Sequence, residues 1–227
     1  MKIKILFFCL FLPVLVLSQE INYTDLNGLK QGIWKKTYDN GSIRYEGQFI
    51  NNNPTGIFFY YFQDGALKAE KNFFLKGHSA AHFFYETGSL KAAGLYINNQ
   101  KDSTWNYYNR DSVLILSEEY KSGKLHGKTK TYYDADEESS DGFFGVYEIK
   151  NWNNGLQEGI WEQYFLDGTL KMQSTFNSGK REGKHLFFYP DGSLSFEGNY
   201  KEDKKAGKWI YYNISGEIDT ILYFNNE

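Results

Sequence analysis

The sequence has very little of several residues that often define the class of a protein. Its 227 residues include three prolines, two methionines and a single cysteine, Cys9, which lies in an apolar run near the start. The rest of the chain therefore offers no thiol nucleophile and cannot be held together by internal disulfides. Lysine and arginine number 25 against 28 aspartate and glutamate residues, a net charge of -3. Without a basic excess, the chain does not fit a general nucleic-acid binder.

Motifs of familiar catalytic and cofactor sites are also missing. The sequence contains no G-x-S-x-G and no H-E-x-x-H stretch. The segment 123–129, GKLHGKT, resembles a phosphate-binding loop but has too few residues between its glycines, and its counterpart 179–185, GKREGKH, indicates a turn between repeats. His78 and His82 would share one side of a helix, but they lie in a predicted turn and strand. We expect no enzyme activity, no catalytic or metal-binding residue and no cofactor.

The first residues, 1–18, have the layout of a secretory signal peptide. Lys2 and Lys4 precede a short apolar run, and Ser18 provides a small residue at the cleavage site. The run is shorter than the ~20 residues that a spanning helix needs, and it contains Pro13. We expect cleavage near Ser18 and export to the periplasm, the cell surface or the medium, with an uncleaved anchor as the alternative.

Aromatic residues are abundant and recur at a fixed period. They make up 19% of the chain, a composition that favours strands over helices. The segment 159–182, GIWEQYFLDGTLKMQSTFNSGKRE, is repeated in pattern by residues 183–206, and such self-similarity indicates a repeat array. We number positions from the first residue of each unit, taken as position 0. Eight units begin at Gly32, Gly56, Ser79, Ser103, Gly127, Gly159, Gly183 and Gly207.

The units divide the chain into a short leader, residues 19–31, and an array, residues 32–227. The fifth unit is longer than the others, and an insertion at about 137–144 would bring Val146 and Trp152 to positions 11 and 17. Position 2 usually carries an aromatic ring. The rings at this position are Trp34, Phe58, Trp105, Trp161 and Trp209.

Each unit reads as a β-hairpin. Two β-rich segments flank a turn such as DNGS or LDGT, in which glycine supplies a positive φ. Positions 2, 4 and 6 of the first strand share a face because side chains alternate. By the same rule we expect positions 11 and 17 of the second strand to share an apolar face, with positions 12 and 14 in water. The fold class predicted is all-β: an elongated, open antiparallel meander of about eight hairpins, on the order of 75 Å long.

The pattern G-x-W-x-x-Y/F-x-x-D/N-G-x-L/I-x-x-E-x-x-Y/F, present as GIWKKTYDNGSIRYEGQF at residues 32–49, resembles the MORN-repeat variant of the bacterial YwqK-like antitoxin-component family. The resemblance covers residues 32–224. It implies an open single-layer sheet that acts as a scaffold, with lipid binding proposed for some MORN arrays. It also implies an antitoxin that neutralises a toxin by direct contact.

These observations favour an exported, non-enzymatic scaffold that binds another protein, because repeated aromatic positions provide large, rigid contact area. The alternative is a binder of glycan or anionic lipid through aromatic rings and lysines, and an antitoxin-like neutraliser is a third reading. Homo-oligomers could form through the array ends. Ala81 and Thr129, at position 2 of the third and fifth units, leave space that favours binding there. The candidate partner-binding residues are Tyr85, Tyr133, Tyr107 and Phe83.

Overall fold

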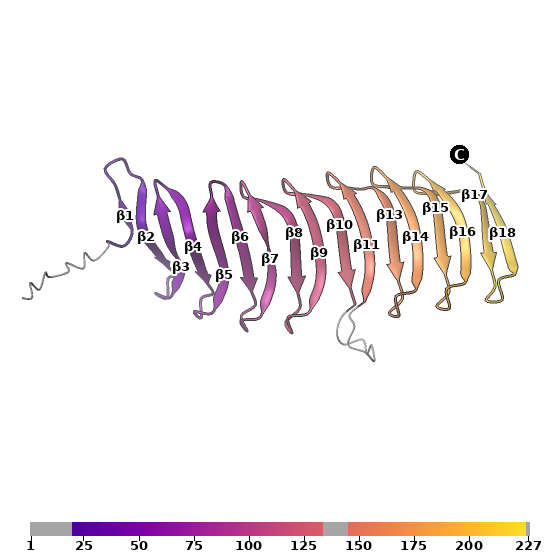
Figure 1. The fold of residues 1–227 in the computed structure, drawn as a ribbon, viewed down its shortest axis with the longest axis horizontal. Coiled ribbons are helices and arrows are strands. Elements are labelled where there is room, and N and C mark those ends of the chain that lie inside the picture. Colours follow the sequence, from indigo (N-terminus) through magenta and orange to yellow (C-terminus); the bar gives the residue numbers. More distant parts are fainter. Residues whose placement is uncertain (1–19, 134–144, 226–227) are drawn as a thin grey trace, which may run out of the picture.

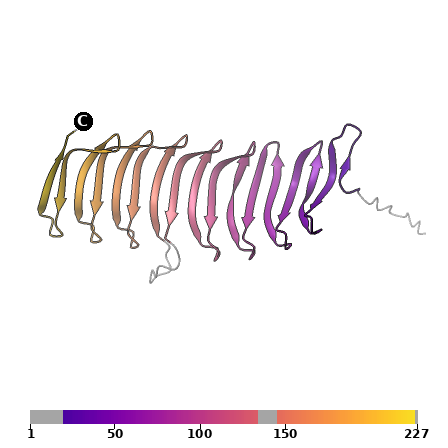
Figure 2. The ribbon, with the colours of Figure 1, turned by 180° about the vertical axis from the view of Figure 1, so that it is seen from behind.

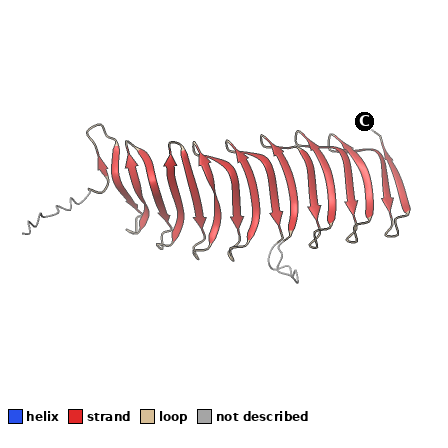
Figure 3. Ribbon diagram, in the orientation of Figure 1, coloured by secondary structure: helices blue, strands red, loops and turns tan. Residues whose placement is uncertain are grey.

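The computed structural model describes residues 20–133 and 145–225, and the regular structure in these ranges is entirely β-strand (Figure 3). This agrees with the predicted all-β class. The strands are β1 Tyr23–Thr24, β2 Lys30–Thr37, β3 Ile43–Ile50, β4 Asn53–Tyr61, β5 Leu67–Leu75, β6 His78–Phe84, β7 Leu90–Ile97, β8 Gln100–Tyr108, β9 Leu114–Lys121, β10 Lys124–Tyr132, β11 Val146–Asn153, β12 Leu156–Gln157, β13 Gly159–Tyr164, β14 Leu170–Asn177, β15 Lys180–Phe188, β16 Leu194–Lys201, β17 Lys204–Tyr212 and β18 Ile218–Phe224.

Each strand pairs in antiparallel fashion with the next strand along the chain. The short β12 and the longer β13 both pair with β11 and act as two parts of one strand. The ribbon is therefore a long, open sheet with its strands side by side in sequence order (Figures 1 and 2). This confirms the predicted meander of hairpins. The predicted signal peptide, residues 1–18, lies outside the described residues.

The turn inside each hairpin follows the expected glycine chemistry. In the first unit the Tyr38 N–H donates to the Ser42 carbonyl at 2.8 Å, and the Gly41 N–H donates back to the Tyr38 carbonyl at 3.0 Å. Gly41 has a φ of 84°, which residues with a Cβ rarely adopt. The DNGS sequence therefore closes a tight turn between β2 and β3.

The fifth unit has the same hairpin pairing around a longer connection. The Tyr133 N–H donates to the Gly145 carbonyl at 3.1 Å, across residues 134–144, which are outside the described ranges and include the predicted insertion at 137–144. Beyond this connection, Val146 pairs with Tyr132 and Trp152 pairs with Gly127. Positions 11 and 17 of the other units make the corresponding pairings.

Each hairpin has one extra residue on its second strand, at position 12. In the first unit Lys36 pairs with Tyr45 and Thr37 pairs with Ile43, so Arg44 lies between the two pairs without a partner strand residue. An extra residue inverts the alternation of side chains beyond it. The prediction that positions 11 and 17 share a face is therefore wrong. Position 12 lies on the face of position 17, and position 11 lies on the other.

Neighbouring repeats are joined by a second irregularity. Between the first and second repeats, Glu46 pairs with Phe59 and Gln48 pairs with Thr55, so residues 56–58 lie opposite a single residue. The same two-residue excess occurs at the start of the fourth to eighth repeats. Position 0 of each of these repeats has positive φ, for example 63° at Gly56 and 59° at Ser103. Glycine at position 0 therefore serves the junction between repeats.

The junction before the third repeat lacks this irregularity. Asn72 pairs with Ala80 and Lys71 pairs with Ala81 in a continuous ladder. Ser79, at position 0, is not among the residues with positive φ, and only 4% of its surface is exposed. This junction therefore has two residues fewer than the others on β6 and one residue more on β5, Phe74, which together account for the shorter spacing from the second unit to the third.

Extra residues at the junctions let a ring at position 2 lie flat on a glycine of the preceding strand. A Cβ added to Gly94 or Gly198 would overlap the ring of Trp105 or Trp209, respectively. Both rings are only 1% exposed, and the Trp105 indole N–H also donates to the Leu95 carbonyl at 2.9 Å. The core of this single sheet is thus a series of ring-on-glycine contacts between adjacent repeats.

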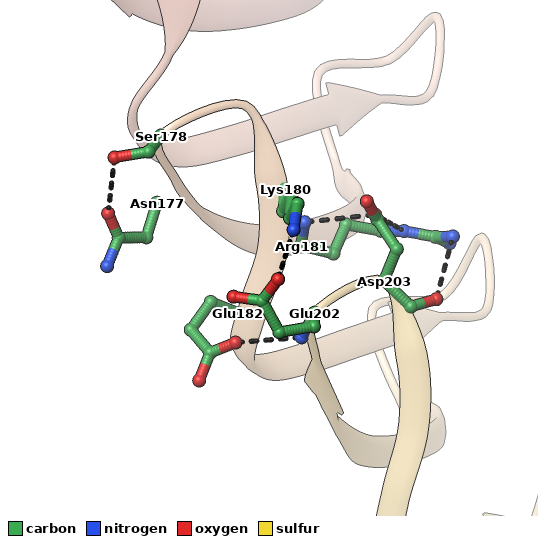
Figure 4. Close-up of polar contacts among 7 residues, drawn as sticks. All are labelled: Asn177, Ser178, Lys180, Arg181, Glu182, Glu202 and Asp203. Carbon is green, nitrogen blue, oxygen red and sulfur yellow. Dashed lines mark hydrogen bonds and ion pairs between the residues drawn. The ribbon is translucent and has the colours of Figure 1, made fainter.

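The turns between hairpins also form bonds with the first strand of the hairpin before them. The Asp203 N–H donates to the Arg181 carbonyl at 3.1 Å, and the Arg181 N–H donates to the Asp203 carboxylate at 3.0 Å. Figure 4 shows this cluster, in which Lys180 pairs with Glu202 and the Glu202 N–H donates to Glu182. Similar bonds link Ser122 to Asp102 and Ser178 to Glu158. Every such bond ties a turn to the start of the preceding hairpin and stiffens the array.

The two ends of the sheet differ. At the N-terminal end β1 covers part of β2, where the Asn22 carboxamide accepts the Lys35 N–H at 2.8 Å and the Asp25 carboxylate accepts the Leu29 N–H at 2.9 Å. At the C-terminal end β18 exposes apolar side chains, including Leu222 at 43% and Tyr223 at 74%.

Candidate functional site

The side chains at positions 2, 4, 13, 15 and 17, together with the position 12 side chains, form one face of the sheet, which we call the aromatic face. Ring contacts follow it from strand to strand. Phe58 lies 5.1 Å from Phe49 and 5.3 Å from Phe73, centroid to centroid. Near the C-terminal end, Trp209 lies 5.3 Å from Tyr200 and 6.1 Å from Phe224. These edge-to-face contacts make the face a continuous, stiff surface.

Adjacent repeats match each other in side-chain size at this face. Where position 15 is glycine, as at Gly47, Gly94 and Gly198, the next repeat has a large ring at position 2. Where position 15 is larger, the next repeat has a smaller residue. In these pairs the first residue is larger than glycine and the second is smaller than phenylalanine or tryptophan: Lys71 with Ala81, Glu118 with Thr129, and Ser174 with His185. The pair of Lys150 and Trp161 departs from this rule, and there the Lys150 ammonium lies 5.5 Å from the Trp161 ring.

The space expected beside Ala81 is occupied from the neighbouring strand. Lys71, which pairs with Ala81, places its ammonium 4.1 Å from the centroid of the Tyr96 ring. Ala81 is only 1% exposed. Burial lowers the pKa of the Lys71 ammonium below its ordinary value of 10.5.

A polar cluster takes the corresponding place beside Thr129. The Tyr120 hydroxyl donates to the Glu118 carboxylate at 2.7 Å, and the Tyr107 hydroxyl accepts from the Lys101 ammonium at 2.6 Å. Burial and the Glu118 charge raise the pKa of Tyr120 to about 12 and raise that of Tyr107 further. Both phenols therefore stay protonated at neutral pH.

Two of the predicted partner-binding residues, Tyr85 and Tyr133, lie at the hairpin-turn edge and join repeats. The Tyr85 hydroxyl donates to the Tyr108 carbonyl at 2.8 Å, and the Tyr133 hydroxyl donates to the Tyr164 carbonyl at 2.7 Å. Tyr38 and Tyr189 make the same bond in their units, at 2.7 and 2.9 Å. Position 6 tyrosines therefore act as clamps between repeats, a role that the sequence spacing did not reveal.

The other two predicted residues, Phe83 and Tyr107, lie on the aromatic face on either side of Trp105. Their ring centroids are 6.2 and 6.4 Å from that of Trp105. All four predicted residues are partly exposed. The structure thus brings Phe83 and Tyr107 together at one face, with Tyr85 at its hairpin-turn edge, whereas Tyr133 lies farther along the array, beside Tyr147 at 5.3 Å.

His185 takes the ring position in the seventh unit and packs there. Its ring lies 5.3 Å from Tyr200 and 5.8 Å from Trp209. Burial, followed by the nearby charges of Arg181 and Lys205, lowers its pKa from 6.5 to about 4. The imidazole is therefore neutral at physiological pH.

Cations gather on the aromatic face. The sequence did not reveal this grouping, because the cations come from different positions of the repeat. One row lies on the face toward the inter-repeat turns, and we call it the cation row. It consists of Lys30, Lys71, Lys101, Lys150, Arg181 and Lys205. A second group at position 12 lies beside the position 6 rings. Its members are Arg44, Lys68, Lys91 and Lys171.

The opposite face has a mixed character. Lys35 pairs with Glu46 at 2.8 Å, and the Tyr61 hydroxyl donates to the same carboxylate at 2.8 Å. Lys184 pairs with Glu197 at 3.4 Å. Opposite charges alternate on this side, so it has no excess of either sign comparable to that of the aromatic face.

Within the described ranges, no three histidine, cysteine, aspartate or glutamate side chains gather as a metal site would require. The same ranges hold no helix with the length and apolar character needed to cross a membrane.

Comparison with known proteins gives a match to one family model. The model of the MORN repeat variant matches residues 30–51, 157–178 and 181–202. No curated protein matches the chain. Among solved structures, a chain titled "Crystal Structure of TcdB2-TccC3-Cdc42" matches with 11% identity and a TM-score of 0.20, and the alignment covers 83% of this chain but only 12% of that one. The three segments that match the family model lie within a longer array of hairpins.

Proposed function

We propose that the protein is an exported, non-enzymatic repeat scaffold that binds another protein. The observation that carries the proposal is the aromatic face, a stiff surface of linked rings and cations that runs along the sheet. Aromatic and arginine side chains on a pre-ordered surface provide contact area at low entropic cost. The MORN repeat matches support a scaffold role in general. An antitoxin-like neutraliser would use the same kind of direct contact.

The position of the surface supports binding along the array rather than in a pocket. The sheet is one layer thick, and its partner would meet residues from several repeats at once. Several weak contacts, each from a different repeat, can then add to a specific complex.

Two measurements test this proposal. Intact-mass analysis of protein from the exported fraction should show a mature chain that begins at Gln19. Crosslinking in the same fraction should recover one partner polypeptide in a fixed ratio. Retention of residues 1–18 would contradict export by cleavage, and the absence of a stoichiometric partner would contradict the scaffold function.

A further inference from the structure

The cation row has a regular spacing that the repeat length does not impose. Its first five members lie on β2, β5, β8, β11 and β15, and β12 and β13 act as one strand, so a cation occurs at every third strand. With ~4.8 Å between strands, the strands that carry neighbouring cations are about 14 Å apart. Lys205 on β17 extends the row by two strands, to a length of about 67 Å.

The aromatic rings hold the cations of this row in place. The ammonium groups of Lys30, Lys101 and Lys205 lie 4.4, 4.7 and 4.2 Å from the ring centroids of Trp34, Trp105 and Trp209, the tryptophans of the repeats that follow them. Such contacts stabilise a lysine side chain by about 0.5–1 kcal/mol at exposed sites and reduce its motion. The charges are thus presented in fixed places.

Most of these charges are not neutralised by the protein. Lys150 pairs with Glu148 at 2.6 Å, and Arg181 pairs with Asp203 at 3.0 Å. Lys30, Lys71, Lys101 and Lys205 form no ion pair with any carboxylate of the described residues. A protein with a net charge of -3 therefore presents a line of unpaired cations on one face. This face is complementary to an anionic ligand that is long and extended.

We propose that the ligand is an extended acidic segment of the partner protein, which lies across the strands along the cation row. The inference rests on the proposed scaffold function and specifies the chemistry of its partner. An extended chain advances ~3.3 Å per residue, so one carboxylate at about every fourth residue matches the spacing of the row. Apolar residues between the carboxylates would contact the rings between the cations, such as Tyr96 and Tyr120.

The charge density of the row distinguishes this ligand from a dense polyanion. Duplex DNA has one charge per ~1.7 Å of axis, whereas the row has one per about 14 Å. Most phosphates of a duplex laid along the row would therefore have no cation to pair with. The rings between the cations would also lie against charged phosphates, which is unfavourable.

The distribution of apolar side chains argues against a lipid bilayer. A membrane-binding surface has its cations and its inserting apolar groups on the same side. Here the exposed isoleucines at position 1 are Ile33, Ile57 and Ile160, which lie on the opposite face. Ile50, Phe74 and Leu75 lie at the edge of the inter-repeat turns. The cations of the aromatic face therefore have few neighbours that could insert.

The test uses the mature chain and a fluorescently labelled synthetic peptide of about twenty residues with glutamate at every fourth position and leucine, serine and glycine between. Fluorescence anisotropy measures its binding. The test variant carries K30Q, K71Q, K101Q and K205Q. Its matched control carries K128Q, K130Q, K184Q and K208Q, which remove the same charge from the opposite face. Because each of the four cations would pair with a carboxylate of the peptide, we expect about a tenfold loss of affinity or more in the test variant and about a twofold loss in the control.

A third variant with arginine at the same four positions of the row keeps the charge and the ring contacts, and it should bind the peptide like the unmodified protein. It separates loss of charge from loss of folding, which thermal melts of all variants also report. Equal losses in test and control, or tighter binding of heparin or of vesicles with anionic lipid than of the peptide, would overturn the inference. If the variant without the row still recovers the crosslinked partner, the scaffold function stands and this inference fails.

Discussion

Replacing Gly94 by alanine should destabilise the array, because the new Cβ would occupy space that the Trp105 ring fills. The ring cannot move away easily. It is 1% exposed, its N–H is bonded to the Leu95 carbonyl, and Tyr96 contacts its edge at 4.9 Å. Overpacking of this kind costs about 1–3 kcal/mol, and the lower entropy cost of fixing alanine in a strand returns only about 0.5–1 kcal/mol. We expect a net loss of about 1–2 kcal/mol in the free energy of unfolding.

A double-mutant cycle makes this prediction specific. Trp105→Ala alone should cost about 3–5 kcal/mol because it leaves a cavity. In the double variant Gly94→Ala/Trp105→Ala the overlap is gone, so the second change should add nothing to the first. The resulting coupling energy should therefore equal the cost of Gly94→Ala alone, about 1–2 kcal/mol, which is within the range for residues in direct contact.

Urea unfolding followed by far-ultraviolet circular dichroism measures the cycle without relying on the tryptophan signal. Ser174→Ala is the control at the same repeat position. A Cβ is already present there, and the buried Ser174 hydroxyl has no hydrogen-bond partner among the described residues, so the control should be neutral or slightly stabilising. Additive effects of the two changes at Gly94 and Trp105 would refute the ring-on-glycine explanation.

Three further predictions concern the junctions between repeats. Tyr85→Phe should lower the free energy of unfolding by about 1 kcal/mol, since it removes only the bond to the Tyr108 carbonyl; an unchanged urea midpoint would contradict the clamp role. Ser103→Gly should stabilise the protein by up to about 1 kcal/mol because it relieves a positive φ, whereas Ser79→Gly should destabilise it by about the same amount; thermal melts of the pair check the opposite signs. The folded pKa of His185 lies below its ordinary value, so the unfolded chain binds the proton first and stability should fall as the pH drops from about 6.5 to about 4; His185→Gln should lose this part of the pH dependence in urea midpoints measured between pH 7.5 and 4.5.

The sequence was sufficient to predict the hairpins, because glycine turns and alternating aromatic residues recur at a fixed period. It was not sufficient to predict the faces of the second strand. The extra residue at position 12 is not marked by any special residue type, since Arg44 and Lys68 look like ordinary solvent-facing residues. One signal was available in the sequence. Gly94 at position 15 is followed in the next unit by the large ring of Trp105 at position 2, whereas Lys71 at position 15 is followed by the small Ala81 at position 2. This correlation in size between one unit and the next points to the contact across the junction.

The cation row could not be found by aligning the units. Lys30 and Lys101 lie two residues before position 0, whereas Lys71 and Lys150 lie at position 15. Only the pairing of strands brings the two sets into one line. Tyr133 was predicted as a candidate for partner binding for a similar reason. Residue spacing alone cannot show that its hydroxyl donates to the Tyr164 carbonyl of the next repeat.

An array of similar hairpins faces a particular hazard while it folds, since a hairpin could pair with the wrong neighbour, one whole unit out of step. Identical joints would make such an arrangement nearly as stable as the correct one. Here the joints differ, and a slip by one unit would place the ring of Trp105 against Lys71 instead of Gly94. Because the units vary, each hairpin packs best against its own neighbours in the sequence. The order of the repeats in the folded sheet is therefore specified by the chain itself.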